Sequence, residues 1–449
     1  MATAIPSHRQ GGYRSSPPPI SPYAHVRDGV IRDWYFLVLL LLAPIQSILV
    51  TPVQGSTPAF MLTLMSGGFL IGNDSRYAKV LLFYVGFWIV YAIYMAFSLS
   101  GYMIDQPDLS RLTVIREIYV YGYLKQTHIT QGGYLFVALL FCFITYQYYQ
   151  DSMLKYAYYG IILLSIYGFY EFIWFAIYHT NGDFLSNRNF GDLDTAAAGA
   201  GSGDFATGSS LQASNIFGPN FMRLKSLVGE PSMYALTVTP FTVYAFVRRW
   251  WVIFALLLLS LLLSTSTTAI IGLGIGGGYA IVRQREEAIL YIIAGLITFA
   301  LLYAAVDPVQ MAVDKLLFQK LDTISGTERL TSFIDHASVV GDGNVVRALF
   351  GLGFGTVRST DMMSNLLANV GIIGFLLYSI ALLAPCFLLR KGSDRDAIVA
   401  TLLAIYFMEM LTVPEYAYLP PWFMVALGYA RVREQRRTPA LPNPTPVAA

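Results

Sequence analysis

Residues 79–99, KVLLFYVGFWIVYAIYMAFSL, are a continuous apolar run whose length and composition decide the fold of this chain. A membrane-spanning helix needs roughly 20 apolar residues, because every backbone polar group must be paired inside the helix. Similar runs recur along the sequence, and we predict about twelve spanning helices. Their predicted ranges are 34–53, 58–72, 79–99, 133–150, 155–178, 232–247, 250–264, 267–282, 288–306, 365–389, 397–413 and 418–430. The expected fold class is all-α, that of a polytopic integral membrane protein.

The composition of the chain supports this interpretation. Hydrophobic residues make up 55% of the 449 residues and charged residues only 12%, whereas a soluble domain carries about 25% charged residues. The net charge of +2 does not favour a nucleic-acid partner. The two cysteines, Cys142 and Cys386, lie in separate apolar runs, and the five histidines form no cluster with ligand spacing. We therefore expect no metal site and no cofactor.

Lysine and arginine residues in the short loops predict the orientation of the helices, because such loops favour the cytoplasmic side. With the N-terminus inside, the inner loops receive basic residues that include Arg248, Arg283 and Lys391. The short outer turns, 54–57, 265–266 and 414–417, contain no Lys or Arg. Both termini are then expected to be cytoplasmic.

The same assignment divides the chain into a membrane domain and two tails. Residues 1–33 contain a Pro-Pro-Pro run and no apolar run, so we predict a disordered tail there. The transmembrane domain is expected over 34–430, followed by a second tail over 431–449. Large outer, periplasmic loops are predicted over 100–132, 179–231 and 307–364, and loops of this length are usually functional or disordered.

The segment RLKSLVGEPS, which starts at Arg223, lies where the second large loop re-enters the membrane. Pro231 suits the first turn of the following helix, which puts Glu230 at the helix N-terminus, where a carboxylate is stabilised. Arg223, Lys225, Glu230 and Ser232 are therefore candidate site residues. In the alternative interpretation, Glu230 and Ser232 only cap the helix, and the two basic residues lie among lipid headgroups.

The third large loop contains a second group of candidates. Arg329 lies in the segment SGTERLTSF, which leads to His336 and then to alternating glycines within 349–356. The glycines lack the flanking strand and helix of a dinucleotide-binding fold, so we interpret them as a tight loop over a site. The alternative is an amphipathic outer helix over 327–340 followed by a turn.

Four further polar features have structural interpretations. A hydroxyl-rich turn at 264–268 is expected to satisfy helix ends. Residues 111–123, rich in Arg and Tyr, suggest an interfacial helix. Glu171 and Glu409 fall in or near apolar runs, where carboxylates are functional candidates unless they pair with a donor.

The order of the motifs resembles a known superfamily. The segment 223–232 is followed by two helices and a Ser/Thr turn, then by Gly-x-x-Arg-Leu at 326–330, Phe-Gly-x-Gly-Phe-Gly at 350–355 and Ser-Asn at 364–365 before Gly-Ile-Ile-Gly at 371–374. This order is similar to that of the O-antigen ligases and the Wzy-type O-antigen and exopolysaccharide polymerases, over roughly residues 155–390. The ligases usually have a His before the position of Asn365, where this chain has Ser364. The departure favours a polymerase.

The resemblance implies an enzyme: a metal-independent, inverting glycosyltransferase on the periplasmic face of the cell inner membrane. It would transfer oligosaccharide repeat units from polyprenyl diphosphate to a sugar hydroxyl, in exopolysaccharide or O-antigen biosynthesis. Membrane lipid, the lipid-linked oligosaccharide, a chain-length regulator and a flippase are the expected partners. An O-antigen ligase-type transferase and a flippase or exporter of lipid-linked glycan remain the alternatives.

The resemblance also suggests roles for the candidate residues. Glu230 would be the general base, with His336 in reserve. Arg223 and Arg329 would hold the diphosphate, because arginine forks match phosphate oxygens. The remaining substrate-binding candidates are Lys225, Ser232 and Asn365.

Overall fold

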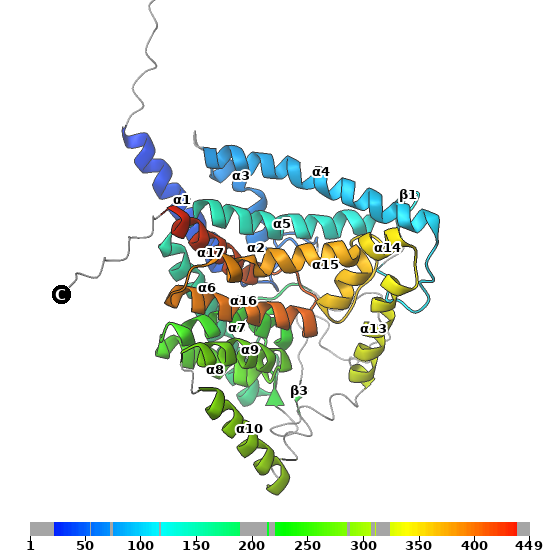
Figure 1. Ribbon diagram of the computed structural model, residues 1–449. Coiled ribbons are helices and arrows are strands. Elements are labelled where there is room, and N and C mark those ends of the chain that lie inside the picture. Colours follow the sequence, from blue (N-terminus) through cyan, green and yellow to red (C-terminus); the bar gives the residue numbers. More distant parts are fainter. Residues whose placement is uncertain are drawn as a thin grey trace, which may run out of the picture.

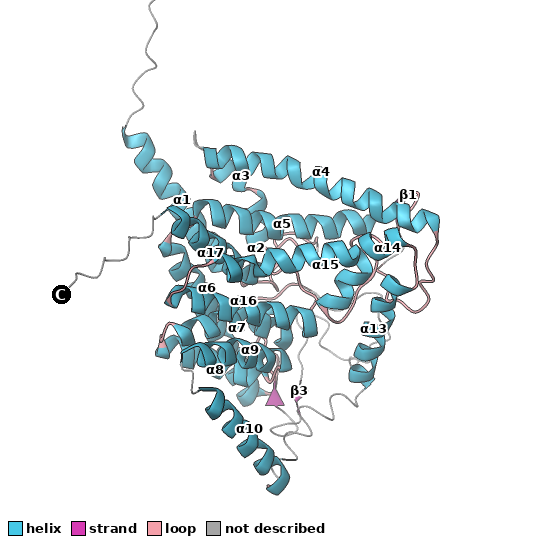
Figure 2. Cartoon of the chain, viewed as in Figure 1, coloured by secondary structure: helices cyan, strands magenta, loops and turns pink. Residues whose placement is uncertain are grey.

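The computed structural model describes residues 22–53, 55–71, 75–115, 118–188, 213–214, 221–284, 288–306, 310 and 324–437. The chain is an all-α membrane protein, and 75% of the described residues are helical and 2% lie in strands (Figure 2). Four described helices are long and apolar enough to cross a membrane, namely Ser75–Ile104, Gln126–Tyr148, Asp151–Tyr178 and Met362–Leu388. Two shorter apolar helices cover Trp251–Ser264 and Thr267–Arg283.

The helices are α1 (Pro22–Leu42), α2 (Pro58–Leu64), α3 (Ser66–Phe69), α4 (Ser75–Ile104), α5 (Gln126–Tyr148), α6 (Asp151–Tyr178), α7 (Pro231–Val247), α8 (Trp251–Ser264), α9 (Thr267–Gln284), α10 (Ala288–Ala305), α13 (Ile324–Gly341), α14 (Val345–Phe350), α15 (Met362–Leu388), α16 (Ser393–Thr412) and α17 (Leu419–Arg437). A 3₁₀ turn, η1, covers Ser226–Val228. The strands are β1 (Tyr119–Tyr121) paired with β2 (Leu124–Lys125), and β3 (Ala213–Ser214) paired with β4 (Phe221–Met222).

The helices pack side by side into one bundle (Figure 1). Helix α16 packs against α7, α9 and α15, α5 packs against α17, and α1 packs against α6. Large side chains that include Phe36, Phe141, Tyr234 and Phe423 are fully buried in the main core. Because lipid offers no hydrophobic force between helices, close packing of such side chains is what holds the bundle together.

Basic residues of the short loops meet at one end of the bundle, which we call the basic end. Arg248 pairs with Asp394, and an Arg431 guanidinium nitrogen lies 2.7 Å from an Asp151 carboxylate oxygen. Arg283 lies 3.7 Å from Asp396. The loops predicted to share the inner side therefore do come together in space, together with the C-terminal part of α17.

The opposite end, which we call the loop end, gathers the connections after α1, α4, α6, α8, α14 and α16 (Figure 1). Helices α13 and α14 also lie there, packed against α15. Helix α13 confirms that residues 327–340 of the third large loop are helical, as the alternative interpretation predicted. The hydroxyl-rich turn lies between α8 and α9, as predicted.

Two predicted boundaries near the N-terminus are wrong. Residues 22–33 belong to α1 rather than to a disordered tail, and Pro22 occupies the first turn, where proline is tolerated. Helix α1 ends at Leu42, because Pro44 disfavours helical backbone in the residue before it, and residues 43–53 form a loop. The predicted span 58–72 consists of the short helices α2 and α3. These still return the chain to the basic end, where Arg76 lies 5.9 Å from the Tyr148 ring.

Three other sequence predictions are corrected. The loop predicted over 100–132 is shorter, since α4 extends to Ile104 and α5 begins at Gln126. The β1–β2 hairpin lies where an interfacial helix was expected, because the chain turns at Gly122, where φ is positive, and Tyr119 and Tyr121 pair with Lys125 and Leu124. The C-terminal tail starts later than predicted, since α17 continues through residues 431–437.

Candidate functional site

Three loops at the loop end are joined by backbone hydrogen bonds. The amides of Gln46 and Ser47 donate to the Leu227 carbonyl, over 2.9 and 3.0 Å. The Ser47 carbonyl in turn accepts from the amides of Asn187 and Arg188, over 3.1 and 3.0 Å. The loop after α1 therefore holds Arg188 close to the η1 turn that precedes α7.

A fourth loop, between α14 and α15, contains the alternating glycines. One asparagine of α15 binds its backbone. The Asn369 side-chain oxygen accepts from the backbone amides of Thr356 and Val357, over 2.9 and 3.0 Å. The Arg358 amide donates to the Thr113 carbonyl over 2.8 Å. The backbone of residues 356–358 is therefore held in place, and the exposed Arg358 side chain extends from it.

A histidine on α5 supports the same loop. The Lys125 amide donates to His128 Nδ1 over 3.2 Å, so in the neutral ring Nε2 carries the proton. His128 Nε2 lies 3.0 Å from the Thr356 hydroxyl and donates to it. The backbone of Gly355 has a φ of +92°, and a Cβ there would lie 2.9 Å from the Thr127 carbonyl. Only glycine fits this approach, which agrees with the prediction of a tight loop.

Glu415 lies in the turn between α16 and α17, between this glycine loop and the start of α7. The Tyr416 ring packs 5.0 Å from the Phe354 ring of the glycine loop. The Tyr418 hydroxyl donates to the Met233 sulfur, in the first turn of α7, over 2.6 Å. Two residues that follow Glu415 in the same turn are thus attached to two different parts of the loop end.

Charged groups of Arg188, Arg358 and Glu230 act on the Glu415 carboxyl. Burial raises the pKa of the Glu415 carboxyl, the guanidinium groups of Arg358 and Arg188 lower it, and the Glu230 carboxylate raises it, which leaves the value at about 7. Burial and the charge of Glu415 raise the pKa of Tyr418 well above its ordinary value. We call Arg188, Glu230, Arg358 and Glu415 the loop-end cluster. A carboxyl group that titrates near neutrality beside two guanidinium groups is suited to proton transfer next to an anion.

Glu230 occupies the predicted position. It is the N-cap residue of α7, and Pro231 is the first residue of the helix. The Glu230 side chain makes no capping hydrogen bond to the helix, so capping by the carboxylate does not account for it. Ser232 follows in the first turn of α7 and is half-buried.

The predicted phosphate ligand Arg223 contacts the turn between α8 and α9. Its Nε donates to the Ser264 carbonyl over 3.2 Å and to the Thr265 hydroxyl over 3.0 Å. Its Nη2 donates to the Thr265 carbonyl over 3.4 Å. These contacts satisfy carbonyls at the end of α8 and give the guanidinium a structural role.

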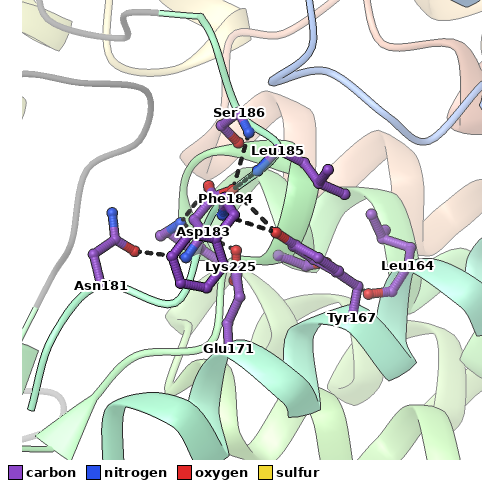
Figure 3. Close-up of polar contacts among 10 residues, drawn as sticks. Leu164, Tyr167, Glu171, Asn181, Asp183, Phe184, Leu185, Ser186 and Lys225 are labelled. Carbon is purple, nitrogen blue, oxygen red and sulfur yellow. Dashed lines mark hydrogen bonds and ion pairs between the residues drawn. The ribbon is translucent and has the colours of Figure 1, made fainter. Parts of the chain in front are cut away.

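The Lys225 side chain is fully buried, so it does not reach a substrate outside the bundle as predicted. Figure 3 shows the polar residues around it. The Lys225 ammonium lies 3.2 Å from an Asp183 oxygen and 3.6 Å from a Glu171 oxygen. Tyr167 donates to the other Asp183 oxygen over 3.3 Å. Glu171 therefore has a cationic partner at ion-pair distance, and the three charged side chains join α6 to the loop after it and to the segment before α7.

The remaining candidates lie on α13 and α15. Arg329 is part of α13, and its side chain falls outside the described residues. His336 is fully buried, and its Nδ1 donates to the Ser332 carbonyl over 2.5 Å. Asn365 is buried, and its side-chain oxygen accepts from the Asn369 amide group over 2.9 Å, so it helps to support the glycine loop. The described contacts place neither His336 nor Asn365 in the loop-end cluster.

Sequence reasoning missed Arg188, Arg358 and Glu415. Glu415 belongs to the outer turn 414–417, which was noted only for its lack of Lys and Arg. A carboxylate in a short turn between two apolar helices was the available signal. Among the described residues, no group of three His, Cys, Asp or Glu side chains is placed to hold a metal ion.

Comparison with known proteins adds no relative to this picture. No protein-family model matches the chain, and no curated protein matches its sequence. The motif order and the loop-end cluster are therefore the features that bear on function.

Proposed function

We propose that this protein is a polysaccharide polymerase, which transfers oligosaccharide repeat units from polyprenyl diphosphate to a sugar hydroxyl of another unit. The reaction is an inverting glycosyl transfer that needs no metal ion. The motif order within 155–390 supports the family, and the loop-end cluster supports the chemistry.

The observation that carries the proposal is the composition of this cluster. Two carboxylates and two guanidinium groups come from four separate segments and interact electrostatically at one end of an apolar bundle. Glycosyl transfer from a diphosphate needs both kinds of group. A carboxylate accepts the proton of the attacking hydroxyl, and cations stabilise the negative charge that develops on the leaving diphosphate.

Arg188 and Arg358 fit the second role better than the arginines chosen from the sequence. Their charges act on the same carboxyl group, that of Glu415, so both guanidinium groups lie near a carboxylate that can accept the proton. Arginine forks bind diphosphate oxygens with two parallel hydrogen bonds. Arg223, by contrast, donates to the α8–α9 turn.

The proposal puts the loop end on the periplasmic face of the cell inner membrane, with both termini in the cytoplasm and about twelve crossings. Support comes from the basic end, where Arg248, Arg283 and Arg431 gather. Clusters of this kind favour the cytoplasmic side. The diphosphate donor would then meet the cluster at headgroup level.

A flippase or exporter is less well supported. Such a protein would use charged residues along its helices to accompany the glycan through the membrane. Here Glu171 is paired with Lys225, and Glu409 accepts a hydrogen bond from Tyr378 over 2.8 Å. A ligase would use the same chemistry with a different acceptor.

The test uses purified protein in lipid nanodiscs. Its substrate is the lipid-linked oligosaccharide extracted from source cells in which this gene has been deleted. A polymerase converts the single repeat unit into a ladder of longer lipid-linked chains on a gel. Transport of the unit across a vesicle membrane without any ladder would instead favour the flippase, and transfer of the glycan to added lipid A–core would favour the ligase.

A further inference from the structure

The loop-end cluster contains two carboxylates that differ in their surroundings. Glu230 is the N-cap residue of α7, at the positive end of the helix dipole, which favours the ionised form. Glu415 lies in a turn, and Tyr416 and Tyr418, which follow it there, are buried. When two titratable groups sit in such different environments, they take different roles.

The geometry points to Glu415 as the group that takes the proton from the acceptor sugar, with the Glu230 carboxylate as a neighbour that tunes it. This inference rests on the proposed function and differs from the sequence-based choice of Glu230 as the base.

Three contacts fix the position of Glu415. The Trp422 ring nitrogen donates to the Tyr416 carbonyl over 2.6 Å, which closes the turn onto the first part of α17. The Tyr416 hydroxyl donates to the Gln131 side chain on α5, and the Tyr418 hydroxyl reaches Met233 on α7. A base must be held in a defined place relative to its substrate, and this turn is attached to both neighbouring helices.

The groups that act on Glu415 come from each element around it. Arg358 belongs to the glycine loop, Arg188 to the loop after α6 and Glu230 to the start of α7. The phenols of Tyr416 and Tyr418 follow it within its own turn, and the Glu409 carboxyl on α16 also interacts with it. Burial and Glu230 favour the protonated form, whereas the two arginines favour the ionised form. Their balance keeps the pKa of Glu415 at about 7, close to the value at which a general base is most efficient.

The step balances without any further reagent. The O–H bond of the acceptor hydroxyl breaks, and its proton passes to the Glu415 carboxylate. The hydroxyl oxygen forms a bond to the anomeric carbon of the donor sugar. The bond from that carbon to the diphosphate oxygen breaks, and its electron pair leaves with polyprenyl diphosphate, which Arg188 and Arg358 hold.

The experiment measures the ladder-forming rate of nanodisc protein between pH 5 and 9, with the extracted lipid-linked repeat unit as probe. A base works only when it is unprotonated, so the wild-type rate falls as pH drops below about 7. Glu415→Gln lowers the rate about 100-fold or more at pH 7 and above and abolishes the acid limb, so the two proteins differ least at pH 5. Glu230→Gln keeps a high rate above pH 7 but moves the acid limb to lower pH, because removing a negative neighbour lowers the pKa of Glu415.

Asp394→Asn is the control. It removes a carboxylate at the basic end, where Asp394 pairs with Arg248, and it lies outside the cluster, so its rate and pH profile should match the wild type. Glu415→Asp keeps the carboxylate and covers the case in which Glu415→Gln does not fold. It should retain more activity than the amide variant and still show an acid limb.

The outcomes separate the two claims. A wild-type protein that forms no ladder sinks the proposed function and this inference with it. A wild-type ladder that Glu415→Gln forms equally fast, with the same pH profile, overturns the inference alone. A 100-fold loss in Glu230→Gln together with full activity in Glu415→Gln would return the role of base to Glu230.

Discussion

The Lys225 ammonium is completely buried between two carboxylates, those of Asp183 and Glu171. Three residues far apart in sequence are thereby joined, and Leu227, two residues after Lys225, accepts the amides that anchor the loop after α1. A buried ion pair contributes little net stability by itself, because desolvation offsets much of the attraction. Removing one partner is costly, because a charge is then left buried and uncompensated.

Lys225→Met tests this role. We expect a loss of about 3–5 kcal/mol of stability, because two carboxylates remain buried without their cation. Thermal unfolding of the nanodisc protein, followed by tryptophan fluorescence, should show a clearly lower transition temperature. Arg248→Met is the control. It breaks the half-exposed pair with Asp394 at the basic end, which is worth about 0–1 kcal/mol. Equal transition temperatures for the two variants would contradict the buried role of Lys225.

At the scale of elements, the glycine loop between α14 and α15 is positioned by the helix that follows it. Asn369 on α15 accepts from two amides of the loop and donates to the Val357 carbonyl over 2.9 Å. His128 on α5 reaches the same loop through Thr356. The backbone next to Arg358 is therefore held by α5 and α15. This support keeps the Arg358 guanidinium near Glu415 before substrate binds.

Asn369→Ala should loosen this loop without unfolding the bundle. Each backbone amide left without its partner costs about 1–3 kcal/mol, and we expect a fall of about 10-fold or more in the ladder-forming rate. Hydrogen exchange should rise at residues 351–358 and stay constant in α5. The control is Asn344→Ala, which removes the N-cap of α14 but none of the contacts of the glycine loop. Unchanged exchange at 351–358 in Asn369→Ala would show that the loop is held by other contacts.

At the scale of the whole molecule, the two ends of the bundle differ in charge and in loop length. The basic end contains the ion pairs of Arg248, Arg283 and Arg431, and the loop end contains the cluster. Such an asymmetry orients a membrane protein, because Lys and Arg in short loops are retained on the cytoplasmic side. It also separates the loop end from the start of α1 and the end of α17 (Figure 1).

Cysteine labelling in intact cells tests this orientation. In a protein with Cys142 and Cys386 replaced by Ala, a single cysteine is introduced at the exposed position Asp342 or Lys391. A membrane-impermeant maleimide should label Asp342→Cys from outside and should label Lys391→Cys only after the membrane is opened. The reverse pattern would show that the protein has the opposite orientation, and labelling of both positions from outside would place on one face two loops that we assign to opposite faces.

The sequence by itself determined which segments are helical and which short loops are basic. Helices α4 to α9 and α15 to α17 lie close to their predicted ranges, because helix formation depends on local apolar composition and on backbone bonds within each segment. The N-cap at Glu230 before Pro231 was predictable for the same reason, since capping is a property of adjacent residues. Local rules were less successful where α1 extends beyond its apolar run.

Only the tertiary structure decided which polar residues meet. Lys225 and Arg223 are two positions apart, yet one is buried against Asp183 and the other contacts the α8–α9 turn. Arg188, Arg358 and Glu415 come from separate loops, and no local pattern links them. Their meeting depends on helix packing and on hydrogen bonds between distant loops, such as those at Ser47 and Asn369. Such contacts form between segments that are distant in sequence and meet only when the chain folds. Composition and local spacing therefore do not predict them.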